Sequence, residues 1–186
     1  ALVGGTTLLI DFATQDKGGT LKDALRVWHE RADGKCACDY GFHMAVTDWN
    51  EQTRRELHEM ADAGVTSFKA YYAYDALMVD DREMYDLLFE MREIGVILGV
   101  HCENGPVLAR LREKAVAAGH TSPAWHPRTR PSIVEGEAVS RFLRIADLAG
   151  APAWIVHLST ADGLSEIRAA RERGQQVLVE SCPQYF

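Results

Sequence analysis

Residues 96–105 read VILGVHCENG, a short apolar run that ends in a histidine and leads into a polar, glycine-containing turn. The run is almost continuously apolar, as expected of a parallel strand that is buried on both faces. A stretch of helical period precedes it at 81–94, and another follows it at 106–118. Residues 81–118 therefore predict a helix, a buried strand and a second helix, which is the repeating unit of a parallel α/β protein.

The same unit recurs along the chain. The predicted strands are Thr6–Phe12, Asp39–Val46, Ser67–Tyr72, Val96–Cys102, Ala153–Leu158 and Gln176–Cys182. The predicted helices are Leu21–Ala32, Glu51–Ala63, Asp81–Ile94, Pro106–Ala118, Ser132–Leu148 and Ala161–Arg173. Six such units in strict alternation predict a parallel sheet with right-handed crossovers. Periodicity alone leaves two architectures open, a doubly wound open sheet and part of a (β/α)₈ barrel. The absence of a Gly-x-Gly-x-x-Gly turn between a strand and a helix weakens the dinucleotide-binding version of the open sheet.

Capping residues support these boundaries. Helix starts are predicted at Thr20, Asp48 and Asp80, which can accept hydrogen bonds from the first backbone N–H groups. Glycines that suit a left-handed backbone follow four helix ends, at Gly64, Gly95, Gly150 and Gly174. The one long connection is Gly119–Arg130, which contains two prolines and is expected to be a surface excursion.

Composition narrows the class of protein. The chain has 186 residues, 47% hydrophobic and 25% charged, which is the ordinary balance of a globular domain. A formal net charge of −7 argues against nucleic acid and membrane surfaces as partners, and no apolar run approaches the roughly 20 residues of a membrane span. The four cysteines lie in or beside apolar runs and are expected to be reduced, which predicts a cytoplasmic protein. The chain opens without Met, so we expect an internal segment of a longer protein.

Three residues that could carry chemistry lie in or at the end of predicted strands: Lys69, His101 and His157. A single histidine at a strand end is more often a packed residue than a ligand, and His43 is expected to be one of these. A lysine inside an apolar strand is harder to explain, because burying its charge costs several kcal/mol without a partner. In parallel α/β proteins, reactive groups gather at the carboxyl edge of the sheet, where loops surround a pocket. Cys36-x-Cys38 lacks a second pair and is a weak metal motif.

Over its whole length, the chain resembles the dihydropyrimidinases and hydantoinases of the amidohydrolase superfamily. The matching motifs are Gly4-Gly5-Thr6-Thr7 with Ile10-Asp11-Phe12, Gly64-Val65 with Ser67-Phe68-Lys69, Ala73-Tyr74, Val100-His101-Cys102-Glu103-Asn104-Gly105, Arg130-Pro131 with Glu135, Glu137 and Ala138, Val156-His157-Leu158-Ser159, and Glu180-Ser181-Cys182-Pro183-Gln184-Tyr185. The set is specific, although no single motif is.

The resemblance implies a partial (β/α)₈ TIM barrel that contains strands two to seven of the metal-dependent amidohydrolase fold. Residues 1–186 would then be an internal segment of one barrel domain. The first strand with its His-x-His, the eighth strand with its catalytic Asp, and the flanking β-sandwich would lie outside the segment, and the segment alone would be inactive.

The resemblance also implies roles for four residues. Lys69 would carry a carbamate that bridges two divalent metal ions, with zinc the preferred metal, and His101 and His157 would bind the second ion. Tyr74 would be both catalytic and substrate-binding, because it would donate a hydrogen bond to the developing oxyanion. Tyr71 and Tyr72 depart from the commoner Phe-Met of the family and are expected to alter the pocket wall.

The implied function is hydrolysis of a cyclic amide, a dihydropyrimidine or hydantoin, to an N-carbamoyl amino acid by a homo-oligomer, a tetramer by resemblance. Allantoinase or dihydroorotase would share the metal site, but the pattern from Phe68-Lys69 to Ala73-Tyr74 favours the dihydropyrimidinase side. Collapsin-response-mediator proteins keep the fold for assembly without catalysis. They lack the metal-binding lysine and histidines, so the presence of Lys69, His101 and His157 favours an enzyme.

Overall fold

Within residues 1–185, six parallel strands lie side by side in the order in which they occur along the chain. The computed structural model describes residues 1–185. The strands are β1 (Leu8–Thr14), β2 (Asp39–Ala45), β3 (Ser67–Tyr71), β4 (Ile97–His101), β5 (Ala153–Ile155) and β6 (Val177–Val179). A doubly wound sheet reverses its strand order at a switch point, whereas a barrel keeps sequential order. The order β1 to β6 therefore excludes the open-sheet alternative and matches part of a (β/α)₈ barrel.

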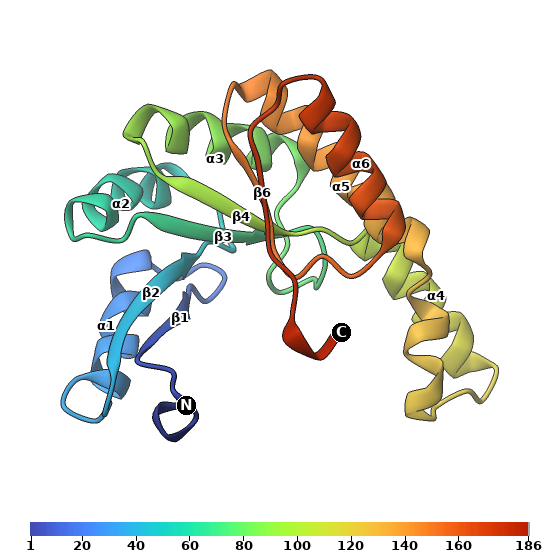
Figure 1. Cartoon of the computed structure of the whole chain (residues 1–186), viewed down its shortest axis with the longest axis horizontal. Helices are drawn as coiled ribbons and strands as arrows, with labels where there is room; N and C mark the ends of the chain where they lie inside the picture. The colour runs from blue at the N-terminus through green and yellow to red at the C-terminus, as the bar shows by residue number, and fades with distance from the viewer. Residues whose placement is uncertain (186) are drawn as a thin grey trace.

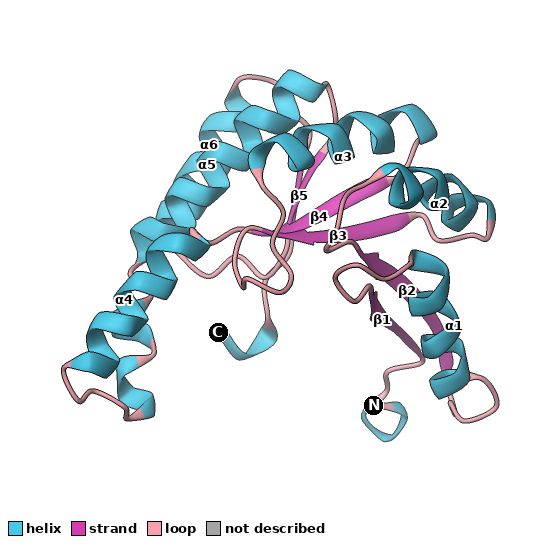
Figure 2. Cartoon of the chain, turned by 180° about the vertical axis from the view of Figure 1, so that it is seen from behind, coloured by secondary structure: helices cyan, strands magenta, loops and turns pink. Residues whose placement is uncertain are grey.

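Within residues 1–185, α-helices cover the outer side of this arc of strands, and α4 (Gly105–Ala117) extends away from the sheet at one end (Figures 1 and 2). They are α1 (Leu21–Ala32), α2 (Glu51–Asp62), α3 (Asp81–Ile94), α4 (Gly105–Ala117), α5 (Ser132–Ala149) and α6 (Ala161–Glu172). Each agrees with its predicted helix within one residue at either end. No helix within residues 1–185 is both long and apolar enough to cross a membrane.

The predicted caps are correct at two helices and wrong at a third. Thr20 accepts from Asp23 N at the start of α1, and Asp80 forms a reciprocal capping box with Glu83 at the start of α3. At α2, however, Asn50 is the cap and accepts from the backbone N–H groups of Gln52 and Thr53. Asp48 stands too far ahead of the first helical turn to reach those groups, and it accepts from Gly18 N at 3.2 Å instead.

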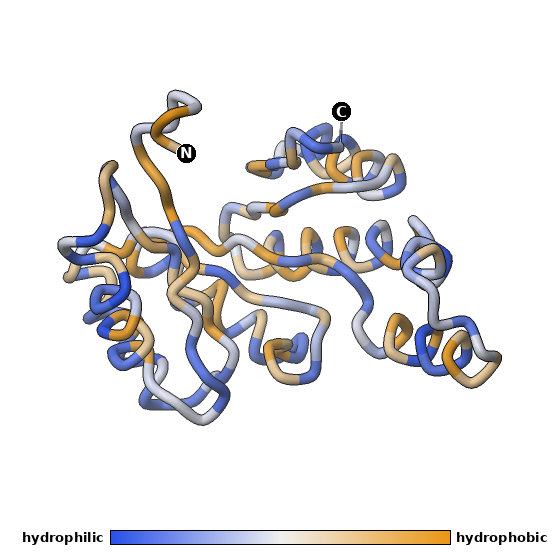
Figure 3. Tube along the Cα trace, turned by 90° about the horizontal axis from the view of Figure 1, so that it is seen from below, coloured by the Kyte–Doolittle hydropathy of each residue, from blue (hydrophilic) through white to orange (hydrophobic). Residues whose placement is uncertain are grey.

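The core lies between the strands and the helices. Phe68 and Leu98 from the sheet are fully or almost fully buried against Leu87, Leu88 and Phe142 from α3 and α5. The first strand differs from its prediction, because β1 spans Leu8–Thr14 rather than Thr6–Phe12 and is not buried on both faces. Leu8, Leu9 and Ile10 are 53%, 43% and 51% exposed, since β1 has a neighbouring strand, β2, on one side only. Figure 3 shows this apolar segment in orange leading away from the N-terminus.

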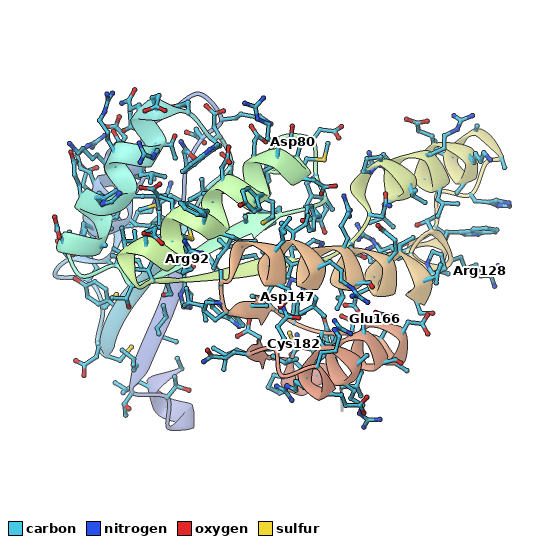
Figure 4. All side chains as sticks on the ribbon, turned by 90° about the horizontal axis from the view of Figure 1, so that it is seen from above. Asp80, Arg92, Arg128, Asp147, Glu166 and Cys182 are labelled. Atoms are coloured by element: carbon cyan, nitrogen blue, oxygen red, sulfur yellow. The ribbon has the colours of Figure 1, made fainter. Side chains whose placement is uncertain are left out.

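The connection from α4 to α5 is a surface excursion, as the sequence predicts, but it has internal structure. It contains two 3₁₀ turns, η2 (Pro123–Trp125) and η3 (Pro127–Thr129). The His120 ring stacks on the Trp125 ring with centroids 3.6 Å apart, and the Arg128 guanidinium lies 4.9 Å from the same ring. Figure 4 places Arg128 at the end of the molecule formed by α4 and this crossover, which we call the α4–α5 crossover (residues 118–131).

Candidate active site

Strand register sets the level of each candidate side chain. In the parallel ladder, Lys69 on β3 pairs with Gly99 on β4, and Tyr71 pairs with His101. Paired residues in a parallel sheet share one face, and side chains alternate along each strand. Lys69, Tyr71 and His101 therefore lie on the same face, with Lys69 one layer deeper. The third predicted ligand, His157, lies two residues beyond the end of β5.

The two histidines meet at the carboxyl edge of the sheet. Nδ1 of His101 lies 3.0 Å from Nε2 of His157, although 56 residues separate them in the chain. Burial, together with the electrostatic influence of Lys69 and His101, lowers the pKa of His157 to about 4. His157 is thus neutral near pH 7, which is the form in which a histidine binds a metal ion.

Lys69 is a buried cation. Only 3% of the residue is exposed, and its Nζ lies 5.6 Å from the ring centroid of Phe12 and 5.1 Å from that of Tyr71. Within residues 1–185, no carboxylate forms an ion pair with it. Burial lowers the pKa of Lys69 to about 8, against the opposing influence of Cys102 and Glu180. A fraction of its amine is therefore neutral near pH 7, unlike that of an ordinary lysine with a pKa of about 10.4.

Two site residues hold an uncommon backbone conformation. Tyr74 has φ of 72° and His157 has φ of 40°, and they are the non-glycine residues with positive φ in the described chain. Such conformations cost about 1–3 kcal/mol and cluster at functional sites. The turn at His157 ends β5 at Ile155, three residues before the predicted end at Leu158. The positions of Tyr74 and His157 in the site therefore depend partly on a strained backbone.

Neighbouring groups hold the His157 turn in place. Ser159 Oγ donates to the His157 carbonyl at 2.9 Å. The buried carboxylate of Glu135, on α5, accepts from Ser159 N at 3.0 Å and also from the hydroxyl of Thr160. Glu135 therefore anchors the loop after His157 to the helix layer.

A cavity of about 710 Å³ opens above the two histidines. Its lining includes Tyr71, Tyr74, His101, Glu103, Arg130 and His157. The volume falls within the roughly 300–1,000 Å³ typical of small-molecule sites. Tyr74 is 44% exposed, and its ring centroid lies 5.1 Å from that of His101. Lys69 does not line the cavity, because it lies one register step below His101.

Sequence reasoning included Glu103 and Arg130 in the matching motifs but gave neither a role beside the histidines. Nε2 of His101 lies 2.8 Å from Oε2 of Glu103, and the same oxygen accepts from Arg130. Burial would raise the pKa of Glu103, but the hydrogen bonds from His101 and Arg130 outweigh it and hold the pKa below its usual value. The role of Glu103 could have been found from its spacing, because it follows His101 by two residues. That of Arg130 could not, because 27 residues separate it from Glu103.

The histidines and cysteines to which the sequence assigned no site role differ in their surroundings. His43 contacts Ser67 Oγ at 2.6 Å, in agreement with the expected packed histidine. His126 is exposed and lines the cavity. His58 is exposed but contacts Glu90 Oε1 at 2.7 Å rather than solvent alone. All four cysteines are free.

The donor chemistry of the site suits a divalent metal ion. Nδ1 of His101 and Nε2 of His157 lie 3.0 Å apart, and the remaining nitrogen of His101 contacts Glu103. Metal-binding histidines commonly have this arrangement, with one nitrogen on the ion and the other hydrogen-bonded to a carboxylate. The candidate set consists of two histidines and a lysine. Residues 1–185 contain no group of three or more His, Cys, Asp or Glu side chains arranged to hold a metal ion.

Comparison with known proteins gives close similarities over almost the whole chain. A D-hydantoinase of Streptomyces coelicolor is 42% identical over 184 residues, which are 98% of this chain and 39% of the relative. A dihydropyrimidinase of Rattus norvegicus is 42% identical over 182 residues, which are 97% of this chain and 35% of the relative. The crystal structure of a dihydropyrimidinase from Brevibacillus agri superposes with a TM-score of 0.96 at 43% identity, covering 98% of this chain and 40% of that one. No protein-family profile matches the chain. The chain spans about two fifths of the length of these relatives.

Proposed function

Because this chain belongs to the family of D-hydantoinases and dihydropyrimidinases, we propose that its full-length protein hydrolyses a cyclic amide to an N-carbamoyl amino acid. The substrate is a dihydropyrimidine or a hydantoin, and residues 1–186 supply strands two to seven of a single amidohydrolase barrel. The observation that supports this most directly is the pair of ring nitrogens of His101 and His157, 3.0 Å apart at the wall of a cavity of about 710 Å³.

The reaction adds water across one ring amide. The water oxygen bonds to the carbonyl carbon, the C–N bond breaks, and the ring nitrogen gains a proton. One end of the opened ring becomes a carboxylate and the other a carbamoyl group. The family is metal-dependent. When bound, divalent metal ions supply Lewis-acid polarisation of the carbonyl and a lowered pKa for water.

Lys69 contributes through its partly neutral amine. That amine attacks the carbon of CO₂, an N–C bond forms and one proton is released, which leaves an anionic carbamate. The change replaces a buried cation that has no carboxylate partner in the described chain with a group whose oxygens can bind cations. The carbamate is still a buried charge, and bound divalent cations would neutralise it.

His101 and His157 would hold the metal ion through neutral imidazole nitrogens. Two such nitrogens with carbamate oxygens suit zinc, and they also suit manganese, iron, cobalt or nickel. Zinc is our first choice. The low pKa of His157 keeps its lone pair free of a proton at neutral pH.

Tyr74 binds the substrate and stabilises the oxyanion. Its hydroxyl donates a hydrogen bond to the carbonyl oxygen as negative charge develops there, and such donors typically contribute a large part of catalysis. Its exposed position on the cavity wall makes the ring available to a ligand. The positive φ at Tyr74 turns this residue out of the strand direction, next to the ring of His101.

The test is an assay of the purified full-length protein on dihydrouracil, hydantoin, allantoin and dihydroorotate, with the ring-opened products identified by mass spectrometry. We expect turnover of dihydrouracil or hydantoin that is lost on chelation and restored by a divalent metal. Preference for allantoin or dihydroorotate would reassign the substrate class. A protein that binds no metal and opens none of the four rings would instead fit an assembly role. Light scattering of the same sample tests the expected homotetramer.

A further inference from the structure

A three-residue network lies beside the candidate metal ligands. The Glu103 carboxylate contacts both the His101 ring and the Arg130 guanidinium through one oxygen, Oε2. The side chains of His101, Glu103 and Arg130 are 10%, 16% and 25% exposed, so the network is largely removed from water. Charge-assisted hydrogen bonds of this kind are strong and directional. This network is therefore able to fix the orientation of a side chain.

The contact with Glu103 decides which nitrogen of His101 carries the proton. A neutral imidazole has one N–H group, and an ionised carboxylate can only accept a hydrogen bond. Nε2 of His101 must therefore carry the proton that it donates to Glu103. Nδ1 is then left with a free lone pair, and this is the atom that faces Nε2 of His157 at 3.0 Å.

Arg130 also links this network to Tyr74, another residue of the cavity lining. Its guanidinium lies 5.8 Å from the ring centroid of Tyr74, whose ring lies 5.1 Å from that of His101. Arg130 follows η3 near the end of the α4–α5 crossover, in which the His120 ring stacks on the Trp125 ring. One arginine thus contacts both the carboxylate behind His101 and the aromatic face of Tyr74.

We propose that Glu103 is a positioning residue that acts through His101, and that Arg130 holds Glu103 in place. Glu103 selects the His101 tautomer with a free Nδ1 and prevents the ring from rotating away from His157. This inference rests on the proposed function, because it assigns His101 to a metal ion.

The alternative is that the network only stabilises the fold, and the chain contains a matched control for that case. Glu90 on α3 is also a buried carboxylate, with a side chain 10% exposed, and it also pairs with one histidine and one arginine. Its partners, His58 and Arg54, lie on α2 and do not line the cavity. Glu90→Ala thus removes the same kind of interaction without touching the site.

The experiment measures zinc affinity of the full-length protein by competition with a chromogenic chelator, together with thermal unfolding. We expect Glu103→Ala to weaken zinc binding by about 10–100-fold, the usual effect of losing a carboxylate behind a ligating histidine. Glu90→Ala should lower the unfolding temperature and leave zinc affinity unchanged. Glu103→Gln keeps an oxygen that can accept from Nε2–H, so it should recover part of the affinity lost in Glu103→Ala. Arg130→Met should weaken zinc binding in the same direction but less.

Equal zinc affinity in wild type, Glu103→Ala and Glu90→Ala would overturn the inference. If Glu103→Ala does not fold, Glu103→Gln decides in its place, since a zinc affinity equal to that of Glu90→Gln would overturn the inference. The two proposals fail separately. Wild-type protein that binds zinc but opens no cyclic amide contradicts the proposed function alone, whereas wild-type activity with unchanged zinc affinity in the Glu103 variants contradicts only the positioning role.

Discussion

The indole ring of Trp154 lies against the backbone of Gly99, and a Cβ atom on Gly99 would stand 2.5 Å from Trp154 Cε3. The two residues are register partners on β4 and β5, and Gly99 pairs with Lys69 on its other side. These residues form the layer directly below His101. Because Gly99 has no side chain, the ring of Trp154 can pack against its backbone and support this layer.

Gly99→Ala should destabilise the full-length protein by about 1–3 kcal/mol, because overpacking a filled core forces side chains and backbone to shift. The measurement is the thermal unfolding midpoint at a fixed scan rate. Gly41→Ala is the matched control, since Gly41 is also in a strand and its added Cβ would meet no atom within 4 Å. Equal midpoints for the two variants would show that the Trp154 contact is not tightly packed.

Lys69→Ala should abolish the carbamate, so metal content should fall and cyclic-amide hydrolysis should drop by several orders of magnitude. Short carboxylic acids added to the buffer should restore part of both, because they can occupy the space left by the carbamate. Metal analysis and turnover on hydantoin check this, with the exposed Lys114→Ala as control. Full metal content and activity in Lys69→Ala would make Lys69 a purely structural residue.

Tyr74→Phe should leave the metal content unchanged and reduce kcat by about 10²–10³, the usual effect of removing one donor to an oxyanion. Tyr71→Phe is the control, because Tyr71 lines the same cavity but is assigned no hydrogen bond to the oxyanion. We expect at most a small change in kcat for that variant. Steady-state kinetics with metal analysis on both proteins separate the two tyrosines, and similar losses in both would remove the special role of Tyr74.

The Glu90 carboxylate should make stability depend on pH. Burial acts to raise its pKa, but hydrogen bonds from His58 and Arg54 outweigh that effect and hold the pKa below the usual 4.5. A lowered folded-state pKa means that the stabilising contribution is complete above the unfolded-state pKa and is lost as pH falls through the folded-state value. The difference in unfolding temperature between wild type and Glu90→Gln should therefore be largest near neutral pH and shrink below about pH 4.5. A constant difference from pH 7 to pH 3 would contradict this assignment.

The sequence by itself determined the helices and strands and most of their boundaries. The helix bounds follow from local apolar periodicity and from caps such as Thr20 and Asp80, whose partners lie only three residues away. The sequence also identified Lys69, because a lysine in an apolar strand is unusual whatever the fold. These signals are local, so they are present before the chain is assembled.

Tertiary structure decided what periodicity left open, which is the order of the strands in the sheet, and it decided the contacts within the site. Nδ1 of His101 reaches Nε2 of His157 across 56 residues, and Arg130 reaches Glu103 across 27. The positive φ of His157, which ends β5 early, depends on the anchoring of its loop by Glu135 from α5. Such contacts depend on strand register and helix packing, which arise from burial of the whole core and leave no local pattern in the sequence.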